Sequence, residues 1–402
     1  NRVPSRRTSP FGSIFFPVIV FLRSFQSFHS IRNMEGDFKH VMHLSYRNFR
    51  SIPEELRDAR KHNVYEIYLK ENMITIVPKW FFVELTHLRF LCLAGNAIDT
   101  LPNEIYRMEC LETLDLSGNA LKRLPNTIGG LQQLGKLLLN ENKIEQLPLE
   151  IGQLHKLEVL EVCKNRLTNI PIQLAQCTVL EDLRMDDNPG LVSIPSRIFN
   201  LPLLVYVSAE RCNLYQLPFT INTTTLRLVL LFSQEHSLTH CPLALERFVR
   251  PDYESMEQKV KRIGNPPCYR QIRCHAVPYL LNLPSELVHV CQRQTVPAIM
   301  PNTLFEIALW TAYTRSVRWG NYDELGLPKC LMNRLIHGPV GCCSSVPCGK
   351  EIFTTAVLAL VKSKKYAQHL VVSVLFCSKL CADRWFQYNC DAYEELSWDI
   401  PQ

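Results

Sequence analysis

The chain has 402 residues, 47% of them hydrophobic, which gives room for two or three domains with substantial cores. Its net charge of +6 is uneven: basic minus acidic residues give +5 for residues 1–34, −3 for 35–221 and +4 for 222–402. The central part therefore lacks the basic footprint of a nucleic-acid-binding protein. The apolar stretch at residues 14–22 is far shorter than the ~20 residues that a membrane span needs, so no membrane segment is predicted.

Residues 1–33 form an Arg- and Ser-rich segment without acidic residues, and Met34 is the first methionine of the chain. We predict that this segment is disordered. One explanation is a non-native leader, translated from sequence upstream of a start at Met34. A signal or transit peptide is the alternative, because such peptides combine basic residues with a short apolar stretch.

A phrase recurs through the next part of the chain, with asparagines spaced 24, 23, 23, 23 and 23 residues apart. The clearest copy runs from Leu111 to Pro125 and reads LETLDLSGNALKRLP. It matches the leucine-rich repeat pattern L-x-x-L-x-L-x-x-N-x-L, in which Cys can replace Asn. A seventh copy carries Cys212 at that position, and an imperfect copy starts at Leu44. The asparagines are Asn72, Asn96, Asn119, Asn142, Asn165 and Asn188.

The alternation within each copy predicts a short strand, with Leu114 and Leu116 pointing inward and Asp115 outward. One such strand cannot bury its apolar face alone, but stacked neighbours form a continuous core. The repeated asparagine satisfies backbone groups where the chain leaves the strand. We therefore predict an α/β fold, a leucine-rich repeat solenoid over residues 34–232 with a parallel sheet on its concave side. A strand at residues 222–232 is predicted to close its end.

The second half of the phrase, L-P-x-x-I-x-x-L, resembles the short intracellular class of these repeats, such as the Ras-suppressor and Scribble-like families. The resemblance covers roughly residues 42–221 and implies a module that binds other proteins. The chain has 16 cysteines, and those of the repeats are spread singly. This spread favours reduced thiols over a secreted disulfide framework. We predict a cytoplasmic location, to which a nuclear one could be added.

Outward strand positions are the candidate partner site, because neighbouring copies align them on one face of the sheet. The apolar candidates are Phe90, Cys92, Leu138, Val159 and Tyr206. The polar candidates are Asp115, Glu161, Asp182, Arg184, Asp186 and Glu210. Most of the polar candidates are acidic, so we expect a protein partner that presents basic residues.

Repeat periodicity ends after Pro218, and residues 233–300 are interrupted by several prolines. They are predicted to be a connector with short helices, one of them at residues 283–294. A further helix is predicted to begin after Pro301 in a segment that covers residues 301–338.

This segment resembles the elongin-binding box and the cullin-selecting box of substrate receptors in cullin–RING ubiquitin ligases. The first box has a small residue and Leu, then Cys and an aliphatic residue; here Ala308 stands where Cys is preferred. The resemblance implies recruitment of elongin B and C and of a cullin by a helix that lies in a groove. The residues that would make these contacts are Leu304, Ala308, Ala312, Leu327 and Pro328. An ordinary amphipathic helix packed onto its own domain is the alternative.

Two cysteine pairs further along predict one structural zinc site. The first pair joins Cys348 to Cys342 or Cys343, of which Cys343 is preferred, and the second pair is Cys377 and Cys381. A β-hairpin, from strands at 352–361 and 369–376, fits between the pairs. Buried thiols without a metal are the alternative.

The zinc-binding domain is predicted to cover residues 339–392, followed by a tail at 393–402. The order of repeats, Leu-Pro box, C-G-x-x-x-F and F-C-S-x-x-C resembles the animal leucine-rich repeat-containing proteins 58 and 28, over about residues 40–390. No enzyme motif is present. We therefore expect a non-enzymatic substrate receptor of an elongin-containing cullin–RING ligase. A scaffold in signalling or polarity complexes is the alternative.

Overall fold

The computed structural model describes residues 40–215, 217–219, 229–231, 241–245, 269–274, 280–284, 309, 311, 313, 332, 334–335, 338–346, 348–353, 356–364 and 371–399. The predicted leader lies outside these residues, as do Leu304, Ala308, Ala312, Leu327 and Pro328 of the predicted adaptor-binding segment. None of the helices formed by the described residues is long and apolar enough to cross a membrane.

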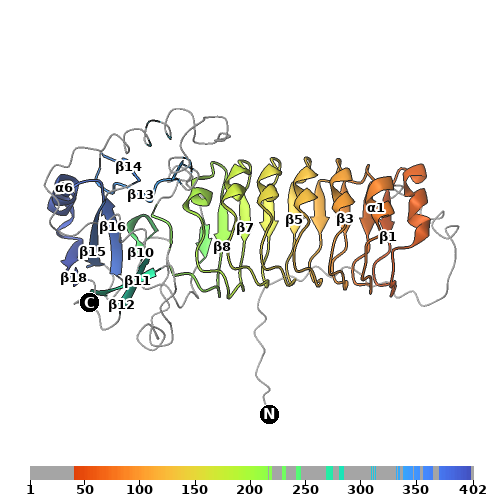
Figure 1. Ribbon diagram of the computed structural model, residues 1–402, viewed down its shortest axis with the longest axis horizontal. Coiled ribbons are helices and arrows are strands. Elements are labelled where there is room, and N and C mark those ends of the chain that lie inside the picture. The colour runs from red at the N-terminus through yellow and green to blue at the C-terminus, as the bar shows by residue number, and fades with distance from the viewer. Residues whose placement is uncertain are drawn as a thin grey trace, which may run out of the picture. The chain divides into compact units, whose positions relative to one another are not determined.

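Short strands from successive coils form one parallel sheet of nine strands (Figure 1). The register places Leu114 between Leu91 and Leu137, and all three are almost fully buried. The middle strand position therefore forms a continuous core row, which confirms the predicted solenoid. The strands are β1 (Val41–His43), β2 (Glu66–Tyr68), β3 (Phe90–Cys92), β4 (Thr113–Asp115), β5 (Lys136–Leu138), β6 (Val159–Glu161), β7 (Asp182–Arg184), β8 (Tyr206–Ser208) and β9 (Val229–Leu231).

Each coil returns through a short helical segment, and most of these segments follow a proline. Pro102, Pro125 and Pro148 have φ angles of −61°, −67° and −66°, which suit the start of a helix. Figure 1 shows these segments in a row beside the strands. They are η2 (Glu54–His62), α1 (Lys79–Glu84), η3 (Asn103–Arg107), η4 (Asn126–Gly130), η5 (Leu149–Gln153), η6 (Ile172–Gln176) and η7 (Ser196–Asn200).

Asn119 shows how the repeated asparagine joins neighbouring coils. Its Oδ1 accepts a hydrogen bond from the backbone N–H of Ile98 at 3.0 Å. Its Nδ2 donates to the carbonyl oxygens of Leu93 at 3.0 Å and Leu116 at 2.9 Å. One buried side chain therefore satisfies backbone groups of its own coil and of the preceding coil.

The residue just before each repeated Asn or Cys has a left-handed backbone conformation. Two coils use glycine, for which this conformation carries no steric cost. The residues are Glu71 (φ 53°), Gly95 (66°), Gly118 (67°), Glu141 (57°), Lys164 (55°), Asp187 (58°) and Arg211 (57°). Lys164 Nζ lies 2.6 Å from Glu141 Oε1 in the neighbouring coil. Arg211 Nε lies 2.5 Å from Asp187 Oδ1, so a second ion pair joins the next two coils.

The described residues of the C-terminal region include three further sheets and the helix α6. A four-stranded sheet has the order β10-β16-β15-β17, a three-stranded sheet β12-β11-β18, and a two-stranded sheet β13-β14. The elements are β10 (Cys241–Pro242), η8 (Leu243–Leu245), β11 (Tyr269–Cys274), β12 (Leu280–Pro284), β13 (Gly341–Cys342), β14 (Glu351–Ile352), β15 (Val357–Ser363), β16 (Val371–Phe376), α6 (Lys379–Asn389), β17 (Tyr393–Leu396) and β18 (Trp398–Asp399).

This region differs from the sequence prediction in three places. The predicted helical connector contains β10, β11 and β12, so Leu283 of the predicted helix lies in a strand. The predicted tail contains β17 and β18, which pair with β15 and β11. The predicted hairpin is present but begins at Val357, because Ile352 pairs with Gly341 instead.

Candidate functional site

The outward positions of β1–β8, with the residues that directly flank these strands, form the open sheet face. The register aligns Phe90, Val159, Asp182 and Tyr206 with the first strand position, and Cys92, Asp115, Leu138, Glu161 and Arg184 with the third. Asp186 and Glu210 follow the ends of β7 and β8. The structure thus brings every predicted partner-binding residue onto this one face.

Cys92 contributes little area to the open sheet face, since only 5% of its surface is exposed. Its thiol donates to Asp115 Oδ2 at 3.6 Å. Burial raises the pKa of Cys92 to about 11, so this thiol stays protonated at neutral pH. A nucleophilic role for it is therefore not supported.

A ladder of aromatic rings crosses the first three strands of the open sheet face. The ring centroids of His43 and Tyr68 lie 4.8 Å apart, and those of Tyr68 and Phe90 lie 4.7 Å apart. The Tyr68 hydroxyl donates to Glu66 Oε2 at 3.1 Å. Sequence reasoning named only Phe90 of these rings. Tyr68 stands four residues before its repeat asparagine, as Cys92 does, and that spacing was the signal that could have found it.

Arg184 organises the acidic part of the face. Its Nη2 lies 2.7 Å from Asp182 Oδ2, and its Nη1 lies 3.7 Å from Glu161 Oε1. Its guanidinium carbon lies 4.9 Å from the ring centroid of Tyr206. The pKa of Arg184 is raised, first by the hydrogen bond to Asp182. Two of the predicted acidic contacts are thus already paired within the protein.

Asp186 has a structural role in addition to its place on the face. Its Oδ1 accepts from the backbone N–H of Glu210 at 2.7 Å, and its Oδ2 accepts from Ser208 Oγ at 2.8 Å.

Two further acidic residues, Glu158 and Glu181, were not predicted. Each is exposed, lies one residue before a strand and adds negative charge beside the open sheet face.

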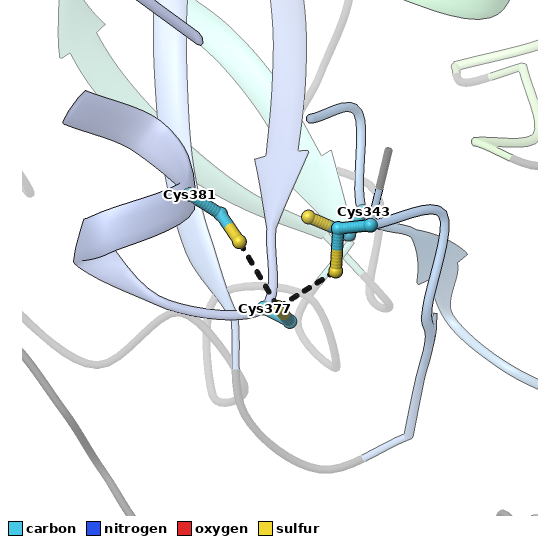
Figure 2. A group of neighbouring side chains, drawn as sticks. Cys343, Cys377 and Cys381 are labelled. Atoms are coloured by element: carbon cyan, nitrogen blue, oxygen red, sulfur yellow. Dashed lines mark hydrogen bonds between the residues drawn. The ribbon is translucent and has the colours of Figure 1, made fainter. Parts of the chain in front are cut away.

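Four cysteines gather in the C-terminal region, and their sulfur atoms all lie within 4.8 Å of one another. Cys348 Sγ lies 3.6 Å from Cys377 Sγ, which lies 3.7 Å from Cys381 Sγ. Figure 2 shows Cys343 and Cys381 with their sulfurs directed toward Cys377. The group that could hold a metal ion contains Cys343, the preferred candidate, and not Cys342.

Local structure explains how these cysteines meet. Cys343 follows β13, and a tight turn, with a hydrogen bond from Cys348 N to Ser345 O at 2.7 Å, brings Cys348 back. Cys377 follows β16, and Cys381 lies in the first turn of α6. Ser378 caps this helix by accepting from Cys381 N at 3.3 Å. The cluster therefore joins a turn to the start of a helix.

The chemistry of the cluster suits a metal ion with four thiolate ligands. The pKa of Cys377 is raised, first by its hydrogen bond with Cys343 and then by burial. Burial also raises the pKa of Cys348. Neighbouring thiolates repel one another, so a bound cation would favour deprotonation of all four. This group could hold one metal ion.

In the first box of the predicted adaptor-binding segment, the structure describes three helical residues, Leu309, Thr311 and Tyr313. Leu309 is fully buried and Tyr313 almost so. The Tyr313 ring lies 5.5 Å from that of Phe353.

Comparison with known families supports the fold. A family model described as "Leucine-rich repeat region" matches residues 80–143. The chain folds as a leucine-rich repeat solenoid. No curated protein matches its sequence.

Three solved structures are similar to this chain over part of its length. The PEPR1–AtPEP1 structure is 24% identical, with a TM-score of 0.44, over 49% of this chain and 28% of that chain. The ectodomain of the Arabidopsis thaliana receptor kinase GASSHO1/SCHENGEN3, in complex with CASPARIAN STRIP INTEGRITY FACTOR 2, is 22% identical, with a TM-score of 0.38, over 48% and 28%. An internalin from Listeria monocytogenes is 20% identical, with a TM-score of 0.36, over 42% and 47%. The matches thus span less than half of those chains.

Proposed function

We propose that this leucine-rich repeat protein is a non-enzymatic module that binds a protein partner on its open sheet face. The observation that carries the proposal is the alignment of apolar and charged side chains in register across β1–β8. Rigid strands present these side chains, so their spacing is set before a partner arrives, which lowers the cost of binding.

Charge favours a partner with basic residues. Among the open-face residues of β5–β8 and the residues that flank these strands, six are acidic and two are basic, namely Lys136 and Arg184. The acidic residues are Glu158, Glu161, Glu181, Asp182, Asp186 and Glu210. The aromatic ladder at the other end offers apolar contact, and Tyr and Phe are typical of residues that dominate binding energy.

We further propose that the protein is a substrate receptor of an elongin-containing cullin–RING ligase, located in the cytoplasm and also in the nucleus. The buried positions of Leu309 and Tyr313 support this idea, because a helix anchored by one face leaves the other for an adaptor. The resemblance to leucine-rich repeat-containing proteins 58 and 28 belongs to the same proposal. A scaffold in signalling or polarity complexes remains the second candidate, supported by the repeat class alone.

We propose zinc as the metal of the cysteine cluster. Four sulfur ligands in a closed arrangement are typical of structural zinc, which leaves no position open for catalysis. The chemistry that zinc would supply is the cross-linking of two chain segments. Cys343, Cys348, Cys377 and Cys381 would hold it.

The combined substitution Phe90→Ala and Tyr206→Ala is expected to abolish partner capture. Phe90 is the last ring of the aromatic ladder, and the Tyr206 ring packs against the Arg184 guanidinium. The double variant therefore removes an apolar ring both from the aromatic ladder and from the acidic part of the open sheet face. Loss of the Phe90 ring pair should lower the stability by only about 0.5–1.5 kcal/mol. Affinity purification of the full chain with mass spectrometry, in cells treated with a cullin-neddylation inhibitor, measures the captured proteins.

Leu149→Ala with Leu203→Ala is the matched control, because both leucines are exposed but lie outside the open sheet face. The control should capture the same partner as the wild type. Equal capture by the sheet-face variant and the control would contradict the proposed site.

Leu304→Asp is expected to abolish recovery of elongin B and C by the full chain, because a charge cannot enter the apolar pocket that the resemblance implies. Leu380→Asp, at an exposed position of α6, is the control and should leave recovery unchanged. If the wild type recovers no elongin, the receptor proposal fails and the scaffold reading gains support.

A further inference from the structure

The end of the solenoid and the cysteine cluster meet at Gly341. Phe219, directly after the last repeat, forms a parallel bridge with Gly341 in β13. The same glycine lies against Leu375 of β16. Cys343 and Cys377 are each two residues further along these two segments. The junction and the cluster are therefore built on the same short stretches of chain.

Packing at this junction leaves no room for a side chain. A Cβ atom at Gly341 would lie 2.6 Å from Leu375 Cδ1 and 3.0 Å from Phe219 Cβ. Both distances are well below ordinary carbon contact of about 3.5–4.0 Å. The segment that carries the cluster thus packs tightly against the chain that leaves the repeats.

A second contact joins the last helical segment of the repeats to the C-terminal region. The guanidinium carbon of Arg197 in η7 lies 5.9 Å from the ring centroid of Tyr313. A Cβ at Gly338 would lie 3.4 Å from Arg197 Cγ. Gly338 itself ends a helical segment, with φ at 77° and its N–H bonded to Arg334 O at 3.0 Å. Two separate positions of the repeats therefore touch residues close to the cluster.

We propose that the metal-bound cysteine cluster forms, together with β9, the C-terminal cap of the solenoid, so that metal binding and order of the last repeats are coupled. The inference rests on the proposed metal centre. The last coil of a solenoid needs a cap because its core has no neighbour on one side. Two backbone hydrogen bonds hold the turn that carries Cys348: Cys343 N donates to Lys350 O, and Ser344 N donates to Leu375 O, each at 2.8 Å. The metal adds the cross-link that fixes this turn to β16 and α6.

Hydrogen exchange of the full chain, with zinc bound and after removal of zinc by a chelator, tests the coupling. Zinc removal is expected to speed amide exchange in residues 196–219 by about tenfold or more, because the cap loosens. Amides of β3–β5, far along the array, should keep their protection. Readdition of zinc alone should restore the original rates.

Gly341→Ala separates the junction from the metal site. This variant keeps all four cysteines, so it should bind one zinc per chain yet show fast exchange in residues 196–219 even with zinc. Gly135→Ala is the matched control, because a Cβ there meets nothing closer than 3.6 Å. It should behave like the wild type.

The outcomes distinguish the two levels of the proposal. A wild-type chain that loses its zinc without any change of exchange in residues 196–219 overturns the cap, while the metal site stands. A wild-type chain that binds no zinc overturns both. Should Gly341→Ala fail to fold, the comparison of the wild type with and without zinc still decides.

Discussion

Replacing Asn119 by alanine is expected to lower the free energy of unfolding by about 1–3 kcal/mol, because it leaves buried backbone groups without partners. The groups affected are the N–H of Ile98 and the carbonyl oxygens of Leu93 and Leu116. Asp115→Ala should cost less than about 1 kcal/mol, since its bond to the N–H of Ser117 lies at a partly exposed position. Urea denaturation of each variant measures the difference.

Asn119→Cys refines this test by copying the last repeat. There Cys212 donates to the carbonyl of Met185 at 3.3 Å, so a thiol can keep one of the bonds. We expect an intermediate loss for this variant. Equal losses for Asn119→Ala and Asp115→Ala would contradict the division into inward and outward positions.

Purified full-length protein is expected to contain one zinc per chain, and Cys377→Ser is expected to lose it. Cys377 lies between Cys348 and Cys381 in the cluster, so its removal leaves three ligands and an open position. Because metal binding and folding are coupled in such sites, the C-terminal region should also lose cooperative thermal unfolding. Elemental analysis and calorimetry measure the two effects.

Cys342→Ser is the matched control for zinc content. Cys342 is the immediate neighbour of Cys343 but does not belong to the group of four. This variant should keep its zinc. A metal-free C-terminal region that unfolds cooperatively would show that the thiols are ordinary buried groups, and the zinc proposal would be abandoned.

The repeats could be predicted from the sequence because a short local pattern of residues determines the strand and the turn of each repeat. Each strand of the repeats is three residues long. The apolar positions held by Leu114 and Leu116 lie at the same distances from the repeat asparagine in every copy. The regular spacing then fixes the sheet, since the same position must meet the same position in the next coil. That is why the positions of the open sheet face could be predicted, although His43, Tyr68, Glu158 and Glu181 were not named.

The C-terminal sheets could not be predicted in the same way, because they have no repeating pattern and some of their strands pair over long distances in sequence. β18 has two residues and pairs with β11, more than 120 residues earlier. No local pattern marks such a strand. Likewise, spacing alone could not choose between Cys342, the last residue of β13, and Cys343, the first residue after it, because that choice depends on the direction of each side chain.

The charges of the candidate site were predicted by type but not by state. Asp182 and Glu161 were expected to bind basic residues of a partner protein, yet Arg184 of the same chain already contacts both carboxylates. Sequence spacing places residues on a face but does not show which neighbours pair. The partner must therefore compete with, or extend, an existing ion pair, so its contribution to affinity is smaller than that of free carboxylates.

The residues with left-handed backbone conformation that precede each repeated Asn or Cys affect how the repeats unfold in acid. Arg211 holds the pKa of Asp187 below its ordinary value, first through their hydrogen bond. This pair therefore stabilises the fold above the ordinary pKa of the carboxyl and is lost as the pH falls through the lowered one. Coils with glycine at this position have no such fastening to lose. In acid, the coils of Asp187 and Arg211 should therefore lose order first, and the loss of order should spread from there toward the coil of Gly118.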